Sequence, residues 1–169
     1  MTFPHCHLTA KDSAYLRSLL ASKDYGEPYL QLLRRKLADA TLMLDHTIDR
    51  RIATIDSRVE FRVGDGAIEH RVLTRNEESA TQGLALPITT LRGLALLGLR
   101  ENDVFSLRKP NGAMEAIRLI KIAYQPEAAR RAIAASAVVP FQPHWLRSLS
   151  KDDETGSDPH DDDPGPGAA

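Results

Sequence analysis

Hydrophobic positions in the first 50 residues recur at helical spacing. One set follows Thr9, whose spacing to Asp12 is that of a capping box, and it consists of Tyr15, Leu16, Leu19 and Leu20. A second set alternates steps of three and four residues, and it consists of Leu30, Leu33, Leu37, Ala40 and Leu44. The two sets predict helices over about residues 10–22 and 28–44. Because only a short turn separates them, we expect an antiparallel helical hairpin with inward-facing leucines.

From Ile55 onward the hydrophobic period changes from helical to two. Val59, Phe61 and Val63 alternate with charged residues, and Gly64 and Gly66 frame a tight turn. Beyond the turn, Ile68 and Val72 share one face with His70. The pattern predicts an antiparallel strand pair with one buried face. We expect that buried face to include Ile68 and Val72.

Further elements follow in a mixed order. Residues 84–88 predict a short strand at a sheet edge, because Pro87 cannot donate a hydrogen bond. Thr89 or Thr90 suits the cap of a helix over 91–97, and Gly98 suits its carboxyl end. Strands are predicted over 104–107 and 114–124, with a turn at 110–112, and a helix over 127–137. The fold class is therefore α+β.

Composition narrows the class of protein. The chain has 169 residues, 42% of them hydrophobic and 5% aromatic, so the core should consist mainly of aliphatic side chains. No hydrophobic run reaches the roughly 18 residues that span a bilayer. The first residues lack the basic and apolar regions of a signal peptide, and Cys6 is the single cysteine. We expect a bacterial-type cytoplasmic protein without a membrane partner.

Charge is distributed unevenly along the chain. Residues 151–169 hold one lysine against seven acidic residues, a net charge of −6, so residues 1–150 carry +5 of the total −1. The basic residues form no dense cluster with interleaved aromatics, so we expect no direct sequence-specific binding of nucleic acid. The acidic segment is too polar to fold unaided, and we expect a disordered tail over residues 150–169.

Three motifs together resemble the C-terminal domain of the Gre transcript-cleavage factors: Ala95–Gly98, Asn102–Val104 and Pro110–Gly112. Within that family, residues 54–61, 95–99 and 124–128 are most similar to the nucleoside diphosphate kinase regulators. The resemblance covers about residues 7–129. It implies an FKBP-like domain, an antiparallel sheet curled around one short helix, behind a short helical hairpin. The implied organisation is a hairpin over 1–50, the FKBP-like domain over 51–129, an extension over 130–149 and the tail.

The resemblance also implies a partner. Members of this family bind RNA polymerase at the rim of its secondary channel, where the C-terminal domain docks and the coiled coil points into the pore. The docking positions carried over onto this chain are Thr90, Leu91, Leu97, Gly98, Asn102 and Asp103. The cleavage factors have Ser-Pro where this chain has Thr90 and Leu91. The implied function is a non-enzymatic transcription regulator that competes with Gre-type factors.

Asp24 and Glu27 lie at the expected hairpin tip and support an alternative function. In the cleavage factors, acidic residues at this spacing hold a Mg²⁺ ion for phosphodiester hydrolysis in the polymerase active site. Helices of about 20–25 Å are too short for that placement. We therefore favour occupancy of the channel over transcript cleavage, and leave a binding module for some other protein as a third possibility.

Other candidate chemistry is weak. His5, Cys6 and His7 are adjacent and cannot easily close a tetrahedral metal shell, so we interpret them as a frayed N-terminus. No serine has a triad pattern and no glycine-rich loop precedes a lysine. Prolyl isomerase activity needs an aromatic pocket, whereas Phe61 and Phe105 are the only phenylalanines in predicted strands. We expect no catalytic residue, no metal and no cofactor.

Overall fold

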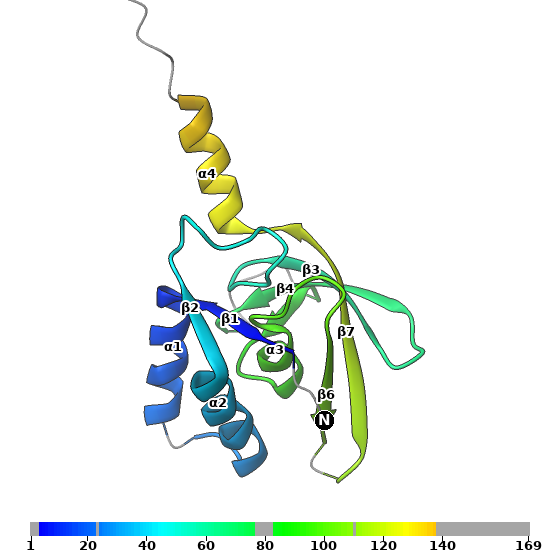
Figure 1. Ribbon diagram of the computed structural model, residues 1–169. Coiled ribbons are helices and arrows are strands. Elements are labelled where there is room, and N and C mark those ends of the chain that lie inside the picture. The colour runs from blue at the N-terminus through cyan, green and yellow to red at the C-terminus, as the bar shows by residue number, and fades with distance from the viewer. Residues whose placement is uncertain (1–3, 23, 77–82, 110, 138–169) are drawn as a thin grey trace, which may run out of the picture. The chain divides into compact units, whose positions relative to one another are not determined.

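The computed structural model describes residues 4–22, 24–76, 83–109 and 111–137. Residues up to Ser136 form one compact unit. It contains four helices and a curled five-stranded sheet, which confirms the mixed α+β class (Figure 1). The elements in chain order are β1 Cys6–Thr9, α1 Ala10–Ala21, α2 Glu27–Asp39, β2 Ala40–Met43, β3 Arg58–Val63, β4 Ile68–Thr74, β5 Ala85–Pro87, α3 Leu91–Leu96, β6 Val104–Arg108, β7 Met114–Tyr124 and α4 Pro126–Ala137.

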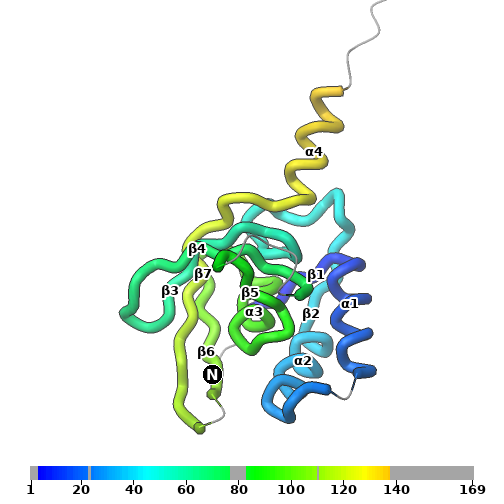
Figure 2. Tube along the Cα trace, turned by 180° about the vertical axis from the view of Figure 1, so that it is seen from behind, coloured from blue at the N-terminus to red at the C-terminus, as the bar shows by residue number. Residues whose placement is uncertain are grey.

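The first helix begins and ends close to its predicted limits. The Asp12 amide donates to Thr9 Oγ1 at 3.0 Å, so the predicted cap is confirmed. Figures 1 and 2 show α1 and α2 lying side by side. The buried positions of α2 are Tyr29, Leu32, Leu33 and Lys36.

The predicted end of the second helix is wrong. The helix ends at Asp39, and residues 40–43 form β2, which pairs in parallel with β1 from Cys6↔Ala40 to Thr9↔Met43. Leu44, the last leucine of the predicted seam, is 59% exposed. The backbone groups of β1 need partners, and the strand pairing that supplies them takes precedence over helical spacing.

The interpretation of the N-terminus as frayed is also wrong. Cys6 and Leu8 are buried in the core, and the His7 amide donates to Gly98 O at 3.0 Å. The strand β1 is therefore held by β2 on one side and by the turn after α3 on the other. Within the described residues, no group of three His, Cys, Asp or Glu side chains is placed to hold a metal ion.

The larger sheet has the strand order β5-β4-β3-β7-β6. The predicted antiparallel pair of β3 and β4 is confirmed, with Glu60 opposite His70. The short strand β5 lies at the sheet edge, as Pro87 predicted, and pairs in parallel with β4. Long β7 pairs with both β3 and β6, and two register shifts bend it along β3.

The predicted buried face of β4 is wrong. Ile68 is 42% exposed and His70 is exposed, whereas Leu73 and Thr74 are buried. His70 stands opposite Glu60, which lies on the face of β3 away from the buried Val59 and Phe61. Because side chains alternate along a strand, this register directs Ile68, His70 and Val72 outward.

The core joins the N-terminal helices, the sheet and α3 in a single cluster. The helix α3 lies within the curl of the sheet, and its residues Leu94, Ala95 and Leu96 have no exposed surface (Figure 1). Leu8, Leu16 and Leu33 belong to the same cluster, so the first helices are packed directly on this core.

The chain after the sheet is described only in part. The helix predicted over 127–137 is confirmed as α4, whose Ile133 is 68% exposed. The predicted apolar cluster at 141–146 and the acidic tail at 150–169 lie outside the described residues. In the part of the chain that is described, no helix is long and apolar enough to cross a membrane.

Candidate functional site

The helix α3 presents the first pair of predicted docking residues at its amino end. Thr90 caps the helix, since its Oγ1 accepts from the Gly93 amide at 3.1 Å and donates to Pro87 O at 2.7 Å. Leu91 is half-buried at the first helical position. The cap therefore fixes the direction in which the Leu91 side chain is presented.

Two of the predicted docking residues lie inside the fold. Leu97 has no exposed surface, and Gly98 is buried with a φ of +80°. The Gly98 amide donates to Ala53 O at 2.8 Å, and its carbonyl accepts from His7. Leu97 and Gly98 therefore determine the conformation of the loop that follows. A partner would contact the exposed residues of that loop and not Leu97 or Gly98 themselves.

The loop at residues 98–103 exposes Asn102, which has a φ of +75°. The Asn102 amide donates to Leu119 O at 2.7 Å, and the Asp103 carboxylate accepts from the Arg100 amide at 2.9 Å. These bonds hold the loop rigidly against β7. The predicted docking residues thus lie at the two ends of α3, which is about 9 Å long.

The acidic residues of the predicted tip are both exposed and both locally bonded. Asp24 accepts from Ser22 Oγ at 2.7 Å. Glu27 begins α2 and accepts from Arg34 at 3.2 Å and from Gln31 at 3.3 Å. These partners fit a turn residue and a first-turn acid of a helix.

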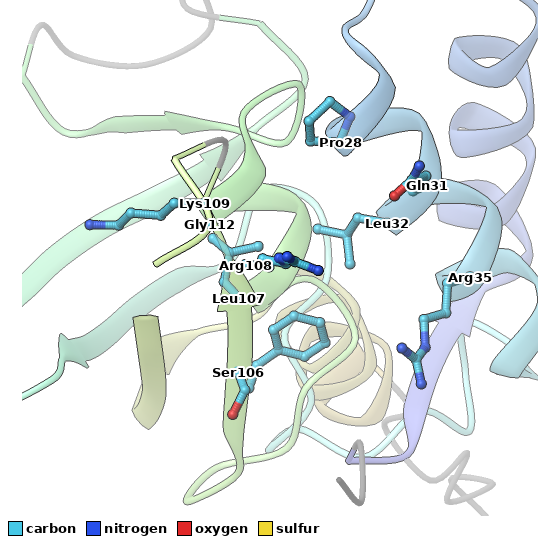
Figure 3. Close-up of a pocket in the computed structure, with 10 residues that line it drawn as sticks. Pro28, Gln31, Leu32, Arg35, Ser106, Leu107, Arg108, Lys109 and Gly112 are labelled. Atoms are coloured by element: carbon cyan, nitrogen blue, oxygen red, sulfur yellow. The ribbon is translucent and has the colours of Figure 1, made fainter. Parts of the chain in front are cut away.

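A groove of about 400 Å³ lies between α2 and β6. Figure 3 shows Gln31, Leu32 and Arg35 of α2 on one side and Leu107 and Arg108 of β6 on the other, with Lys109 pointing away from α2. Arg35 pairs with Asp39 at 3.5 Å, and Lys109 pairs with Glu115 at 2.5 Å. Protein carboxylates therefore already neutralise two of its cations.

Two polar side chains tie α2 to both ends of α3. The Tyr29 hydroxyl donates to Ile88 O at 3.0 Å, ahead of the helix. The buried Lys36 ammonium donates to Ala95 O at 2.9 Å and to Leu97 O, at its carboxyl end. Burial lowers the pKa of Lys36. The N-terminal helices are thereby fixed to the element that carries the predicted docking residues.

A second buried polar group joins α1, the turn at residues 54–57 and α4. Thr54 Oγ1 donates to the buried Glu127 carboxylate at 2.7 Å, and the Ile55 amide donates to Asp12 at 3.4 Å. Asp12 is 4% exposed. Burial, reinforced by the nearby negative charges of Glu127 and Asp45, raises the pKa of Asp12 to about 6.

Replacing Asp12 with asparagine should stabilise the protein at pH 8 and have little effect at pH 4. The pKa of Asp12 rises from 3.8 to about 6 on folding, so the folded state holds this proton more tightly. Its contribution is complete below pH 3.8 and is lost as the pH rises through about 6. At 1.36 kcal/mol per pKa unit, the free energy of unfolding lost at high pH is about 3 kcal/mol. An asparagine at this position still accepts from the Ile55 amide and carries no charge, so it should recover about 1–2 kcal/mol of this loss.

Urea unfolding at both pH values tests this prediction. Asp65→Asn in the exposed turn after β3 is the control for the removal of a surface carboxylate. If Asp12→Asn lost the same stability at pH 8 and at pH 4, the charged carboxylate of Asp12 would not be the form that destabilises the folded protein.

Sequence reasoning missed Lys36 and β1 for different reasons. Lys36 follows Tyr29, Leu32 and Leu33 at helical spacing, so the period alone would have placed it on the buried face. Its charge, in contrast, predicted an exposed side chain. The segment 6–9 alternates poorly and is too short for a period to be read, so no sequence signal identified the strand.

Comparisons with known proteins were made with the whole sequence and fold. No family model matches the chain. The proteins named "Regulator of nucleoside diphosphate kinase" from Escherichia coli (strain K12) and Shigella flexneri are each 29% identical over 131 residues, which is 76% of this chain and 96% of each relative. A solved prokaryotic transcription elongation factor GreA/GreB from Nitrosomonas europaea is 27% identical, with a TM-score of 0.57 over 72% of this chain and 99% of that one.

These findings confirm the resemblance drawn from the sequence. The chain is similar to nucleoside diphosphate kinase regulators in sequence, and to a Gre-type elongation factor in both sequence and fold. The matched relatives are covered almost from end to end, so the likeness extends to both the N-terminal helices and the sheet. The relatives are named as a regulator and a transcription factor.

Proposed function

We propose that this chain is a non-enzymatic transcription regulator that binds RNA polymerase at the rim of the secondary channel and competes there with Gre-type factors. The observation that carries the proposal is the similarity to an elongation factor over 99% of that factor's length. Any other proposed function would have to account for a similarity that spans almost the whole of that elongation factor. In this proposal the protein acts in the cytoplasm and needs no cofactor.

In this proposal the FKBP-like domain, residues 51–129, docks through the two ends of α3. The exposed residue of this surface is Asn102, and Thr90, Leu91 and Asp103 are half-buried. Hydrogen bonds to Pro87 and Leu119 hold the two parts in place before binding. A surface ordered in advance loses little entropy on association.

The helices α1 and α2 act as an antiparallel hairpin that partly fills the channel mouth. They contain 12 and 13 residues, which corresponds to about 18 and 20 Å. Asp24 and Glu27 are engaged with Ser22 and Arg34, which supports a structural role for these carboxylates over metal binding. The mechanism is therefore occupancy of the channel entrance. Residues 130–149 and the acidic tail follow these two domains in the sequence.

Leu91→Asp should weaken binding to core RNA polymerase at least tenfold. An aspartate at the first position of a helix is compatible with the helix dipole and presents a charge in place of an apolar contact. Because Leu91 also packs partly against the core, thermal melting must verify that the variant folds. A tenfold loss corresponds to about 1.4 kcal/mol, a modest value for a central interface residue. Co-elution and competition with a long channel-plugging Gre factor measure the affinity.

Ile133→Asp on α4 is the matched control, because Ile133 is 68% exposed and lies outside the proposed surface. It should bind like the wild type. Equal affinities of wild type and Leu91→Asp would exclude docking through α3. Failure to retain any polymerase subunit would favour a different protein partner.

A stalled-complex assay separates occupancy from cleavage. Under the proposal, the protein leaves the nascent RNA at full length. Shortening of the RNA that Asp24→Ala abolishes would establish the cleavage alternative.

A further inference from the structure

The outer face of the large sheet, which points away from α3 and the core, is strongly basic. Exposed cations on β3, β6 and β7 contribute to it, and they are Arg58, Arg62, Arg108, Arg118 and Lys121. Within the described strands, the carboxylate on this face is Glu60, which lies opposite both His70 and Lys121. The face therefore carries a large excess of positive charge.

Two of these cations are placed against each other. Arg62 of β3 and Arg118 of β7 are register partners on neighbouring strands. Among the described residues, neither guanidinium forms an ion pair. Like charges that face each other across a strand pair are unfavourable. An anion bound between the two guanidinium groups would relieve this repulsion.

Beside this pair lies a hollow of about 590 Å³ at the ends of β3, β4 and β7. Its lining includes Arg58, His70 and Tyr124, the apolar Val72 and Leu84, and two carboxylates at its side, Asp56 and Glu60. Tyr124 is 45% exposed, and the Arg58 guanidinium lies 5.9 Å from its ring centroid. An accessible aromatic ring thus stands next to a row of cations.

The spacing of the charges favours a chain of anions over a single one. Arg58 and Arg62 are four residues apart on β3, a separation of about 13 Å. One phosphate cannot contact both, whereas a backbone with repeated charges can follow the row. The exposed tyrosine offers a platform for stacking a base, which an acidic peptide would not use.

We propose that the outer face of the sheet binds single-stranded nucleic acid without sequence preference. The backbone phosphates contact Arg58, Arg62, Arg118 and Lys121, and one base stacks on Tyr124. This surface uses other residues than the proposed docking surface, although Arg118 adjoins the loop of Asn102 and Asp103. The inference therefore goes beyond the proposed function and does not depend on it.

Fluorescence anisotropy with labelled single-stranded RNA and DNA of about 12 nucleotides tests this proposal on the full chain. Binding should weaken steeply as salt rises from about 50 to about 200 mM. Arg62→Glu with Arg118→Glu should reduce affinity at least tenfold. The control, Lys11→Glu with Arg17→Glu on the exposed side of α1, makes the same change in net charge and should have a much smaller effect. Thermal melting verifies that each variant folds, and Arg62→Gln with Arg118→Gln replaces the reversed pair if it does not.

Tyr124→Leu distinguishes nucleic acid from other polyanions. It should weaken oligonucleotide binding about tenfold and leave binding of polyglutamate unchanged. Several results would overturn the proposal: no oligonucleotide binding at about 50 mM salt, equal losses in the two double variants, or polyglutamate binding as tight as RNA with no effect of Tyr124→Leu. The last result would assign the face to an acidic protein segment.

Discussion

Gly98→Ala should lower the free energy of unfolding by about 2–5 kcal/mol, the largest single-residue effect that we expect. Gly98 has a φ of +80°, and a Cβ there would lie 2.6 Å from Cys6 Sγ and 2.9 Å from the His7 carbonyl oxygen. The left-handed backbone alone costs about 1–2 kcal/mol for alanine. Relief of the clash requires β1 to move, which adds about 1–3 kcal/mol.

Gly83→Ala separates these two contributions. Gly83 has a φ of +85°, yet a Cβ there meets no atom of the described residues within 4 Å. It should therefore lose only about 1–2 kcal/mol, the backbone contribution. Urea unfolding of both variants gives the comparison. Equal losses would mean that β1 does not press against Gly98 in solution.

Lys36→Met should cost about 2–4 kcal/mol, the second largest effect. Methionine fills similar space but cannot donate to Ala95 O and Leu97 O, so two carbonyls at the end of α3 lose their buried donor. Removal of the buried charge saves some desolvation energy, which works in the opposite direction. The lowered pKa of Lys36 shows that burial penalises its charged form, so this saving offsets part of the loss.

The pH dependence gives a second measurement for the same variant. The unfolded chain holds the Lys36 proton more tightly than the folded protein does, so this lysine's contribution is lost as the pH falls through its lowered folded pKa. The wild type should therefore become more stable relative to Lys36→Met as the pH rises from about 7 toward the ordinary lysine pKa of about 10.4. Lys11→Met on the exposed side of α1 is the control. Equal stabilities of Lys36→Met and wild type at every pH would contradict the bonding role.

Local signals predicted much of the fold correctly. The spacing of Thr9 and Asp12 predicted the start of α1, and Thr90 and Gly98 predicted both ends of α3. Alternation predicted the buried Val59 and Phe61 of β3. In each case the information lies within a few residues, because caps, turns and pleats are properties of the local backbone.

The errors arose where distant segments decide the local structure. Residues 40–43 are helical by spacing, yet they form a strand because β1 lies beside them. The face of β4 depends on its register with β3, and the basic face of the sheet gathers cations from strands far apart in the sequence. A single sequence does not show such pairings. The predicted docking residues were chosen by resemblance, and the burial of Leu97 and Gly98 depends on contacts across the whole fold.

The contact between β1 and the turn after α3 has a consequence for biosynthesis. Cys6 contacts the carbonyl of Leu97 across 91 positions of the chain, and the neighbouring His7 bonds to Gly98. Translation at about 5–20 residues per second separates the emergence of these two segments by several seconds. The strand β1 is thus synthesised well before the turn that completes its packing. Until then the nascent chain exposes Cys6 and Leu8, which makes this interval the natural point for chaperone capture or thiol oxidation.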